Sequence, residues 1–532
     1  MPAKKKGSQR GSGEAMAPMG ARVYDLTQFG AAGDGAALNT KSIQRALDAA
    51  AKSGGGTVYA PPGDYVTGTI HLRGNVTLWL EAGATIWGSR DRADYEQGCL
   101  IYAENAKNAA IRGRGAIDGN GEAFWRRERG RLYMGEWHPD PNAGEKWIPA
   151  EWRPARLMRL VRCDHLLLED ITIRNSPAWT VHLVDCDDVD IRGISILNGI
   201  YENEGLNTDG IDPDGCSNVR ISGCFLQTGD DSIVLKISNR PGGRRVCRDI
   251  TVTNCVLISM CTAIKIGSET HGEFRNIAIS NCVVKDAGNG IGLWMRDGGV
   301  IDGVLINNIA MTLKAGGEPI YIWSWPRNET TPHGIIRNVT ISNVTADGGG
   351  CAFISGTAES PVENVALDNV RFFMRGEYDK PFHADPPHPL KVWGFREAAY
   401  DVFCRYAKNL ALRNLALTWN SPEQPKWGSA IRCRDVNGLE INGFVGRASA
   451  NSNAATIQLE RVANALIHNC RATEGSGAFL KIGEGAKNVS LMNNDLALAR
   501  KAVVGHTGLG AGEMFEGGNR KPKNRKPRET KA

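Results

Sequence analysis

Three aspartates lie close together in the sequence, each near a glycine. Asp209 is followed by one glycine, and 21 residues after Asp209 the pair Asp230 and Asp231 follows another. Two carboxyl groups that flank a glycosidic bond can hydrolyse it, one by giving a proton and the other by activating water. Crowded carboxylates repel each other, so one keeps its proton at a raised pKa, as a general acid must.

Aspartates at corners of the chain also have a simpler use, which is to cap turns or to bind calcium. Asp212 and Asp214 are interpreted as turn residues of this kind. Asp209, Asp230 and Asp231 can act together only if the fold places them on neighbouring structural repeats, so we examined the chain for repeats.

A motif of the form Val-x-Ile-x-Asn/Gly recurs along most of the chain. Its first position, the anchor, falls at Leu166, Val189, Val219, Ile250, Ile277, Val304, Val339, Val365, Leu410, Leu439, Ala465 and Val489. Alternating β-branched residues predict a short strand, and the polar or glycine residue four positions later predicts a sharp corner. A second short strand follows in many repeats, as at 232–236 and 263–267. Such units predict the coils of a parallel β-helix.

Asp209 and Asp230 are separated by about one coil, so they are expected to project from neighbouring coils onto one face. The cysteines fit the same repeat. Eight of the 13 stand at fixed distances from an anchor, which predicts ladders of small buried thiols rather than a disulfide framework.

The predicted solenoid covers residues 22–515, with an amphipathic helix near its start that caps the open end. Asn39 is the expected N-cap of this helix. Long insertions, rich in aromatic residues, are expected at about 120–158 and 374–406, where they could line a binding groove.

Charge and hydropathy exclude several classes of protein. The net charge is +5, but residues 1–20 and 519–532 together hold +9, which leaves −4 for the body. The basic ends are therefore expected to be disordered tails, at 1–21 and 516–532, and not a nucleic-acid footprint. No apolar run is long enough to span a membrane. No apolar segment follows the basic N-terminus, so no signal peptide is predicted.

Several short sequence motifs, taken together with their order along the chain, resemble those of a known family. They are Phe29-Gly30-Ala31, Gly33-Asp34-Gly35, Gly54-Gly55-Gly56, Pro62-Gly63, Asp118-Gly119-Asn120-Gly121 with Trp125, Arg153-Pro154, Asn175-Ser176-Pro177 with Trp179 and His182, Asn207-Thr208-Asp209-Gly210, and Gly229-Asp230-Asp231. Over roughly residues 22–500 the chain resembles glycoside hydrolase family 28, the polygalacturonase-like pectin hydrolases.

The resemblance implies a right-handed, single-stranded parallel β-helix and hydrolysis with inversion. It implies that Asp230 is the general acid, that Asp209 and Asp231 activate water, and that no metal or other cofactor takes part. The implied partner is a carbohydrate, and we expect a monomer. A polymeric substrate would require a secreted or periplasmic enzyme, whereas an oligosaccharide would allow a cytoplasmic one.

Departures from the family pattern concern recognition of the uronate carboxylate. Thr262 stands where polygalacturonases carry a histidine, and Gly292-Leu293-Trp294 stands where they carry Arg-Ile-Lys. Trp294 could offer an apolar platform for a sugar face. Plain polygalacturonate is therefore not the expected substrate. A rhamnogalacturonan or a substituted or short oligosaccharide is favoured, and a groove closed by the first insertion would give exo action.

Further residues are candidates for substrate binding. They are Asn207, Lys236, Lys265, His271, Trp294 and Arg296. Arg296 could instead simply pair with Asp297, and His271 could be an ordinary loop residue.

Two other functions remain open. A polysaccharide lyase on the same solenoid would need a base and commonly calcium, for which Lys265 and Asp231 could serve. A non-catalytic carbohydrate-binding solenoid would bind sugar without making new reducing ends. The set of three aspartates favours the hydrolase.

Overall fold

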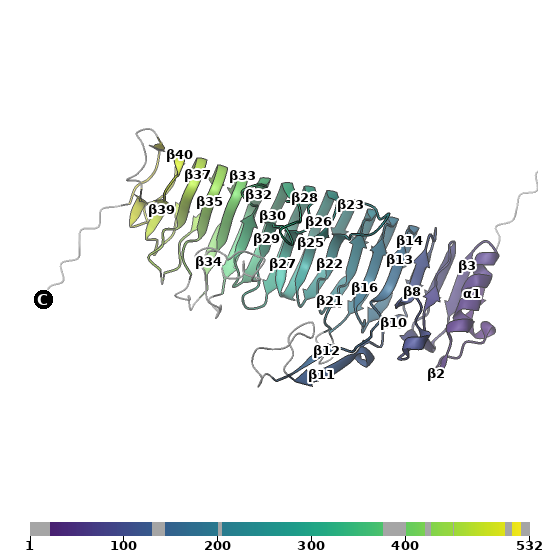
Figure 1. The fold of residues 1–532 in the computed structure, drawn as a ribbon. Helices are drawn as coiled ribbons and strands as arrows, with labels where there is room; N and C mark the ends of the chain where they lie inside the picture. Colours follow the sequence, from purple (N-terminus) through teal and green to yellow (C-terminus); the bar gives the residue numbers. More distant parts are fainter. Residues whose placement is uncertain are drawn as a thin grey trace, which may run out of the picture.

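The computed structural model describes residues 22–129, 144–199, 205–375, 401–420, 427–450, 452–505 and 513–522. Nearly all strands join one continuous parallel sheet that coils into a long rod, a parallel β-helix with the helix α1, Thr40–Lys52, at its N-terminal end (Figure 1). No helix in these ranges is long and apolar enough to cross a membrane.

Each coil presents three faces, which we name A, B and C. Face A carries the anchors, on β3 Gly56–Ala60, β6 Val76–Leu80, β9 Ala110–Gly113, β14 Asp164–Glu169, β17 Asp187–Arg192, β20 Ser217–Ser222, β23 Val246–Thr253, β26 Glu273–Ala287, β28 Val300–Leu313, β30 Ile335–Gly348, β32 Val362–Met374, β40 Lys487–Met492 and β42 Met514–Gly517.

Face B consists of β5 Ile70–His71, β8 Cys99–Glu104, β13 Arg156–Val161, β16 Trp179–Val184, β19 Ile211–Asp214, β22 Ile233–Ile237, β25 Thr262–Thr270, β27 Asn289–Met295, β29 Ile320–Ser324, β31 Ala352–Ser355, β33 Val402–Arg413, β35 Ile431–Asn442, β37 Ile457–His468, β39 Ala478–Ile482 and β41 Lys501–Val504. The strands β33, β35 and β37 continue from face B into face A.

Face C consists of β4 Gly63–Thr67, β7 Ala84–Gly88, β10 Ala116–Asp118, β15 Thr172–Arg174, β18 Ser195–Leu197, β21 Phe225–Thr228, β24 Val256–Ser259, β34 Ala416–Trp419, β36 Val445–Gly446 and β38 Arg471–Ala472. The later halves of β26, β28, β30 and β32 complete this face.

The anchor row is confirmed at every step. Each anchor from Leu166 to Val489 pairs in register with the next one along the chain. The corner residues four positions later all have left-handed φ, between 52° and 68°. These are conformations that Asn, Asp and Gly tolerate best, which explains why those residues follow every anchor.

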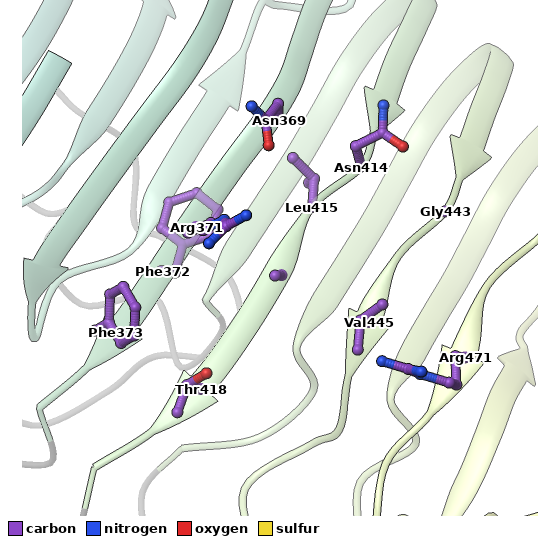
Figure 2. A pocket seen from close by; sticks show the side chains of 11 residues that line it. Asn369, Arg371, Phe372, Phe373, Asn414, Leu415, Thr418, Gly443, Val445 and Arg471 are labelled. Carbon is purple, nitrogen blue, oxygen red and sulfur yellow. The ribbon is translucent and has the colours of Figure 1, made fainter. Parts of the chain in front are cut away.

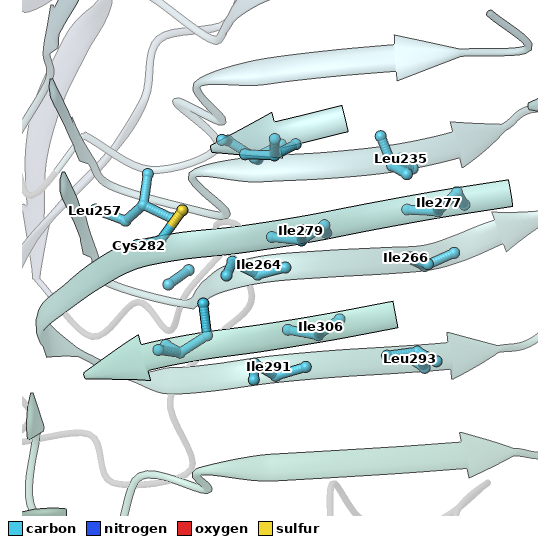
Figure 3. Packing of buried hydrophobic residues seen from close by; sticks show 14 of the residues in the cluster. Leu235, Leu257, Ile264, Ile266, Ile277, Ile279, Cys282, Ile291, Leu293 and Ile306 are labelled. Atoms are coloured by element: carbon cyan, nitrogen blue, oxygen red, sulfur yellow. The ribbon is translucent and has the colours of Figure 1, made fainter. Parts of the chain in front are cut away.

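Side chains from the faces meet inside the coil and stack along its axis. Figure 3 shows Ile264 and Ile266 of β25 beside Ile291 and Leu293 of β27, with Ile277 on the neighbouring β26. These residues are almost fully buried. All 13 cysteines are free thiols, and all but Cys261, which is partly exposed, are buried. Most of the buried thiols lie within the same stack.

The N-terminal cap forms as expected, with one difference. The helix α1 spans Thr40–Lys52 and buries the apolar face that includes Ile43 and Leu47. Asn39 stands at the N-cap position, but its side chain bonds to the backbone of Ala32 and Ala37 instead of to the first helical turn. Near it are β1 Val23–Asp25, β2 Asp34–Leu38 and the 3-10 turn η1 Leu26–Phe29.

The structure shortens both expected insertions and lengthens the solenoid. In the first insertion, η3 Gly121–Phe124 leads to an antiparallel pair, β11 Trp125–Arg129 and β12 Glu145–Pro149, that projects from the rod (Figure 1). The coil resumes at β13, and β33 already belongs to the solenoid, while residues 376–400 lie outside the described residues. The end expected at residue 515 is too early, because β42 crosses it and Arg520 still pairs with Asp495. Residues 1–21 and 523–532 also lie outside the described residues.

Candidate active site

The register of face B fixes the relative places of the three aspartates. Ile211 of β19 pairs with Ile233 of β22, so the residues two positions earlier, Asp209 and Asp231, occupy equivalent places on successive coils. Neighbouring strands are about 4.8 Å apart. From its 21-residue spacing Asp230 was expected in this relation to Asp209. The coil is one residue longer, so Asp231 takes that place and Asp230 lies beside it at the corner.

Hydroxyl groups connect successive coils at this corner between faces C and B. The Thr208 hydroxyl accepts a hydrogen bond from the Gly229 amide at 3.0 Å. The hydroxyls of Thr228 and Ser259 donate to the carbonyl oxygen of Asp230 at 2.7 and 2.8 Å. The backbone that carries the aspartates is therefore held by the coils on both sides of it.

Asn207 and Arg153 position the carboxyl group of Asp230. The amide Nδ2 of Asn207 donates to Asp230 Oδ2 at 3.3 Å, while its Oδ1 accepts from Arg153 Nη2 at 2.8 Å. The Arg153 guanidinium lies 4.9 Å from the ring centre of Trp125. Arg153 thus orients the amide so that its NH₂ faces Asp230. It was not among the predicted site residues, although the string Arg153-Pro154 supported the resemblance.

Lys236 lies between two carboxylates on the upstream side of the corner. Its Nζ is 3.1 Å from Asp209 Oδ2, 2.9 Å from Asp212 Oδ1 and 3.4 Å from the ring centre of Trp179. Burial alone would lower the pKa of Lys236, but the two aspartates raise it above its ordinary value. Burial raises the pKa of Asp209, and Lys236 opposes that rise. The lysine therefore stays charged between its carboxylates.

A second buried lysine serves the downstream side. Lys265 Nζ lies 2.6 Å from Asp231 Oδ2, and the backbone amide of Thr262 donates to Asp231 Oδ1 at 3.1 Å. Burial would lower the pKa of Lys265, but Asp231 holds it well above its ordinary value. Lys265 also lies 5.4 Å from the ring centre of Trp294. Each of Asp209 and Asp231 thus has its own buried ammonium group.

Asp212 and Asp214 are not the turn residues that the sequence suggested. Both lie in β19 and are fully buried. Burial raises the pKa of Asp212 to about 6, against the opposing effect of Lys236. Asp214 bonds to His182 Nε2 at 3.2 Å and pairs with Arg240. Because side chains alternate along β19, Ile211 faces the core, whereas Asp212 and Asp214 project to the other side of the strand, where partners on the neighbouring coils bury them.

The charges of the corner suit proton transfer. The carboxyls of Asp209, Asp212, Asp230 and Asp231 share two ammonium groups, so retained protons relieve their repulsion. Ligand atoms of Asp230, Asp231 and Cys261 lie within 4.8 Å of one another, a donor set that could hold a cation. Since the ammonium group of Lys265 already bonds to Asp231, the metal-free mechanism remains our prediction.

The expected sugar platform at Trp294 is wrong for this conformation. Trp294 is only 5% exposed. Its ring stacks on Trp323 at 5.5 Å with an angle of 14° between the planes. Both belong to an aromatic cluster on face B that also contains Tyr321, Cys351, Phe353 and Phe403. Neighbouring coils thus cover the indole instead of leaving it to a ligand.

A tyrosine from the next coil covers Gly292, the position at which an arginine of the family pattern was expected to be replaced. Gly292 pairs with Tyr321 across β27 and β29. A Cβ on Gly292 would lie 2.2 Å from Tyr321 Cζ, so no larger residue fits while the ring is there. The Tyr321 hydroxyl bonds to Thr262 Oγ1 at 3.0 Å. Thr262 and Gly292 therefore contact the same tyrosine.

Arg296 and His271 differ in their contacts with Asp297. Arg327 makes two bonds to Asp297, at 2.6 and 2.9 Å, and His271 Nε2 lies 3.5 Å from the same carboxylate. Arg296 does not pair with Asp297 or with another carboxylate among the described residues. Its guanidinium lies 5.2 Å from the Trp294 ring centre and donates to the Arg327 carbonyl at 3.3 Å. Arg296 is thus a cation available to an anionic ligand, whereas His271 belongs to the Asp297 ion pair.

Comparison of the sequence with known proteins shows similarity to glycosyl hydrolases. The family model of glycosyl hydrolases family 28 matches residues 56–381. A probable polygalacturonase of Vitis vinifera is 26% identical over 401 residues, which cover 68% of this chain and 76% of the relative. An exopolygalacturonase of Zea mays is 25% identical over 377 residues, which cover 67% of this chain and 85% of the relative.

A solved structure shares the fold. The hyperthermoactive exopolygalacturonase of Thermotoga maritima superposes with a TM-score of 0.59 and 24% identity, over 75% of this chain and 92% of that one. The matched family region contains all three aspartates, their two lysines and the coils that hold them. The chain belongs to glycosyl hydrolases family 28 and is an O-glycosyl hydrolase.

Proposed function

We propose that the protein is an inverting hydrolase of glycosidic bonds in pectin-type or related acidic polysaccharides or oligosaccharides. The observation that carries this proposal is the pair of equivalent positions held by Asp209 and Asp231, each bonded to a buried ammonium group. A neighbouring cation favours the ionised carboxylate, the form that a base needs.

In the proposed reaction Asp230 gives its proton to the leaving glycosidic oxygen. Asp209 and Asp231 together take a proton from the attacking water, whose oxygen forms the new bond to the sugar as the old bond breaks. Asn207 holds the Asp230 carboxyl, and Arg153 holds Asn207. The lysines offset negative charge while both bases are ionised.

Plain polygalacturonate is not the proposed substrate. Tyr321 occupies the space over Gly292, and Trp294 is buried, so neither position can present the family's cations. Lys265 is engaged with Asp231, which leaves Arg296 as the proposed contact for an acidic group on this side. We propose a substituted or short pectic chain or a rhamnogalacturonan, and alternatively exo-polygalacturonase action.

Exo action is supported by the first insertion. It carries Trp125, and Arg153 bridges this tryptophan to Asn207 at the catalytic corner. Strands β11 and β12 could therefore wall off one end of the groove. Relatives whose names include "exopolygalacturonase" fit this proposal. A polymeric substrate would place the enzyme outside the cell or in the periplasm, and we propose that it acts as a monomer.

Lys265 disfavours the lyase alternative. A lyase base must accept a proton, but the raised pKa of Lys265 beside Asp231 keeps this lysine protonated. Incubation with polygalacturonate, rhamnogalacturonan and their oligomers separates the possibilities. Hydrolysis gives new reducing ends without ultraviolet absorbance. A lyase gives absorbing unsaturated ends, and a binding solenoid gives neither product.

A further inference from the structure

A groove lies on face C of the C-terminal coils, away from the aspartates. It encloses about 330 Å³ between β32, β34, β36 and β38. Arg371 stands at one end and Arg471 at the other, with Val445 between them (Figure 2). Phe373 lies beside the groove on β32. The groove therefore has cations at its ends, with apolar residues and the polar side chains of Asn369, Asn414 and Thr418 between them.

The strand register makes the two arginines members of one outward row. Successive paired positions are Ala310, Thr345, Arg371, Ala416, Val445 and Arg471. Three strand steps separate the arginines, which puts their Cα atoms roughly 14 Å apart. Figure 2 shows the Arg471 side chain extending toward Val445, on the side of the groove opposite Arg371. Between the two arginines the row holds no charged side chain, and beyond Arg471 it continues to Asp495, whose carboxylate pairs with Arg520.

The guanidinium groups of Arg371 and Arg471 differ from those of neighbouring arginines. Among the described residues, no carboxylate forms an ion pair with Arg371 or Arg471, and both side chains are exposed. Nearby arginines behave differently, since Arg413 pairs with Glu440 and Arg375 pairs with Asp347. Two guanidinium groups in one row, three strand steps apart, are suited to an extended ligand with acidic groups on both sides of a neutral stretch.

We propose that this groove is a second carbohydrate-binding site, which holds a segment of acidic polysaccharide outside the catalytic corner. Carboxylates of the segment bind Arg371 and Arg471, and the faces of the intervening sugars lie over Ala416 and Val445. The identity of the occupant as a uronate chain rests on the proposed function. The site would hold a long substrate on the rod while another part of it is cleaved.

The test is affinity electrophoresis of the full chain in gels that contain polygalacturonate, in the Asp230→Asn background so that the polymer stays intact. Addition of Arg371→Ala and Arg471→Ala should weaken retardation at least about tenfold in apparent Kd, since each charge-assisted contact contributes about one decade or more. The control removes two exposed arginines elsewhere, Arg114→Ala and Arg500→Ala, and should migrate as the parent does.

Three outcomes would overturn the site. They are unchanged retardation of the Arg371/Arg471 variant, equal weakening in the control, and equal retardation by fully methyl-esterified polymer or by DNA. Hydrolysis is measured separately with Asp230 intact, where the same double variant should keep its turnover of a short oligosaccharide. If no acidic sugar is hydrolysed at all, the proposed function fails, while the gel still decides whether the groove binds polyuronate.

Discussion

The two sides of the proposed catalytic corner are built from different kinds of side chain. Upstream, Lys236 lies over the Trp179 ring and joins Asp209 to Asp212 in a charged cluster. Downstream, Lys265 holds Asp231, but the next coils are filled by stacked aromatic rings, with Tyr321 over Gly292. The upstream and central residues carry the hydrolytic reaction that we propose. The downstream residues support our proposal that the substrate is not plain polygalacturonate.

The largest effect should come from the acid at the centre of the corner. Asp230→Asn keeps the shape but removes the proton donor, so turnover should fall by at least about two decades. Turnover on the best substrate of the panel is the measurement. Asp286→Asn, which changes an exposed aspartate on a later coil, is the control and should keep full activity. Near-normal activity of Asp230→Asn would place the chemistry elsewhere.

Removal of the upstream lysine should cost stability. Lys236→Met leaves Asp209 and Asp212 buried without their cation, and breaking a buried pair typically costs about 3–5 kcal/mol. Urea unfolding measures the loss. Lys481→Met, which removes an exposed lysine from the same face, should change the free energy of unfolding little. Equal stability of the two variants would show that Lys236 does not offset these carboxylates.

The downstream side can be changed toward the family pattern. Gly292→Arg alone should disrupt packing, because its Cβ would meet the Tyr321 ring. In combination with Tyr321→Ala, the arginine gains room and a carboxylate contact. We expect kcat/KM on polygalacturonate to rise about tenfold over Tyr321→Ala alone, from one charge-assisted contact. No gain, or efficient turnover of this polymer by the unaltered protein, would mean that another cation such as Arg296 already recognises it.

The smallest effect expected is a shift in pH dependence. Asp209 must be ionised to act as a base, so activity is lost as pH falls through its pKa. Burial raises that pKa and Lys236 opposes the rise. Lys236→Met should therefore move the acid limb of kcat/KM to higher pH, by about one unit or more. If the acid limb of kcat/KM stays in place or moves to lower pH, Asp209 is not a base that Lys236 keeps ionised.

The repeating part of the fold could be read from the sequence because it is local. Every anchor and every left-handed corner residue obeys a pattern that spans five positions, so the anchor row from Leu166 to Val489 is correct at each step. The same pattern located the corner that carries the aspartates. The end of the solenoid and the end of the second insertion were not predicted correctly, because β42 and β33 have no distinctive composition at their ends.

What the sequence could not show depends on contacts between coils. Asp231, and not Asp230, takes the place equivalent to Asp209 because the coil is one residue longer than the 21-residue spacing suggested. Burial of Trp294 depends on Trp323, and the space at Gly292 depends on Tyr321, both one coil further along the chain. Arg153 lies 54 residues before Asn207, so its role in orienting that amide is visible only after folding.

The most direct test of the central proposal is proton NMR of the first product on a substrate that the enzyme hydrolyses. If Asp209 and Asp231 activate water while Asp230 protonates the leaving group, the product must first appear with inverted anomeric configuration, before mutarotation mixes the anomers. Retention in the first turnovers would contradict this mechanism, because one of the aspartates would then have to act as a nucleophile.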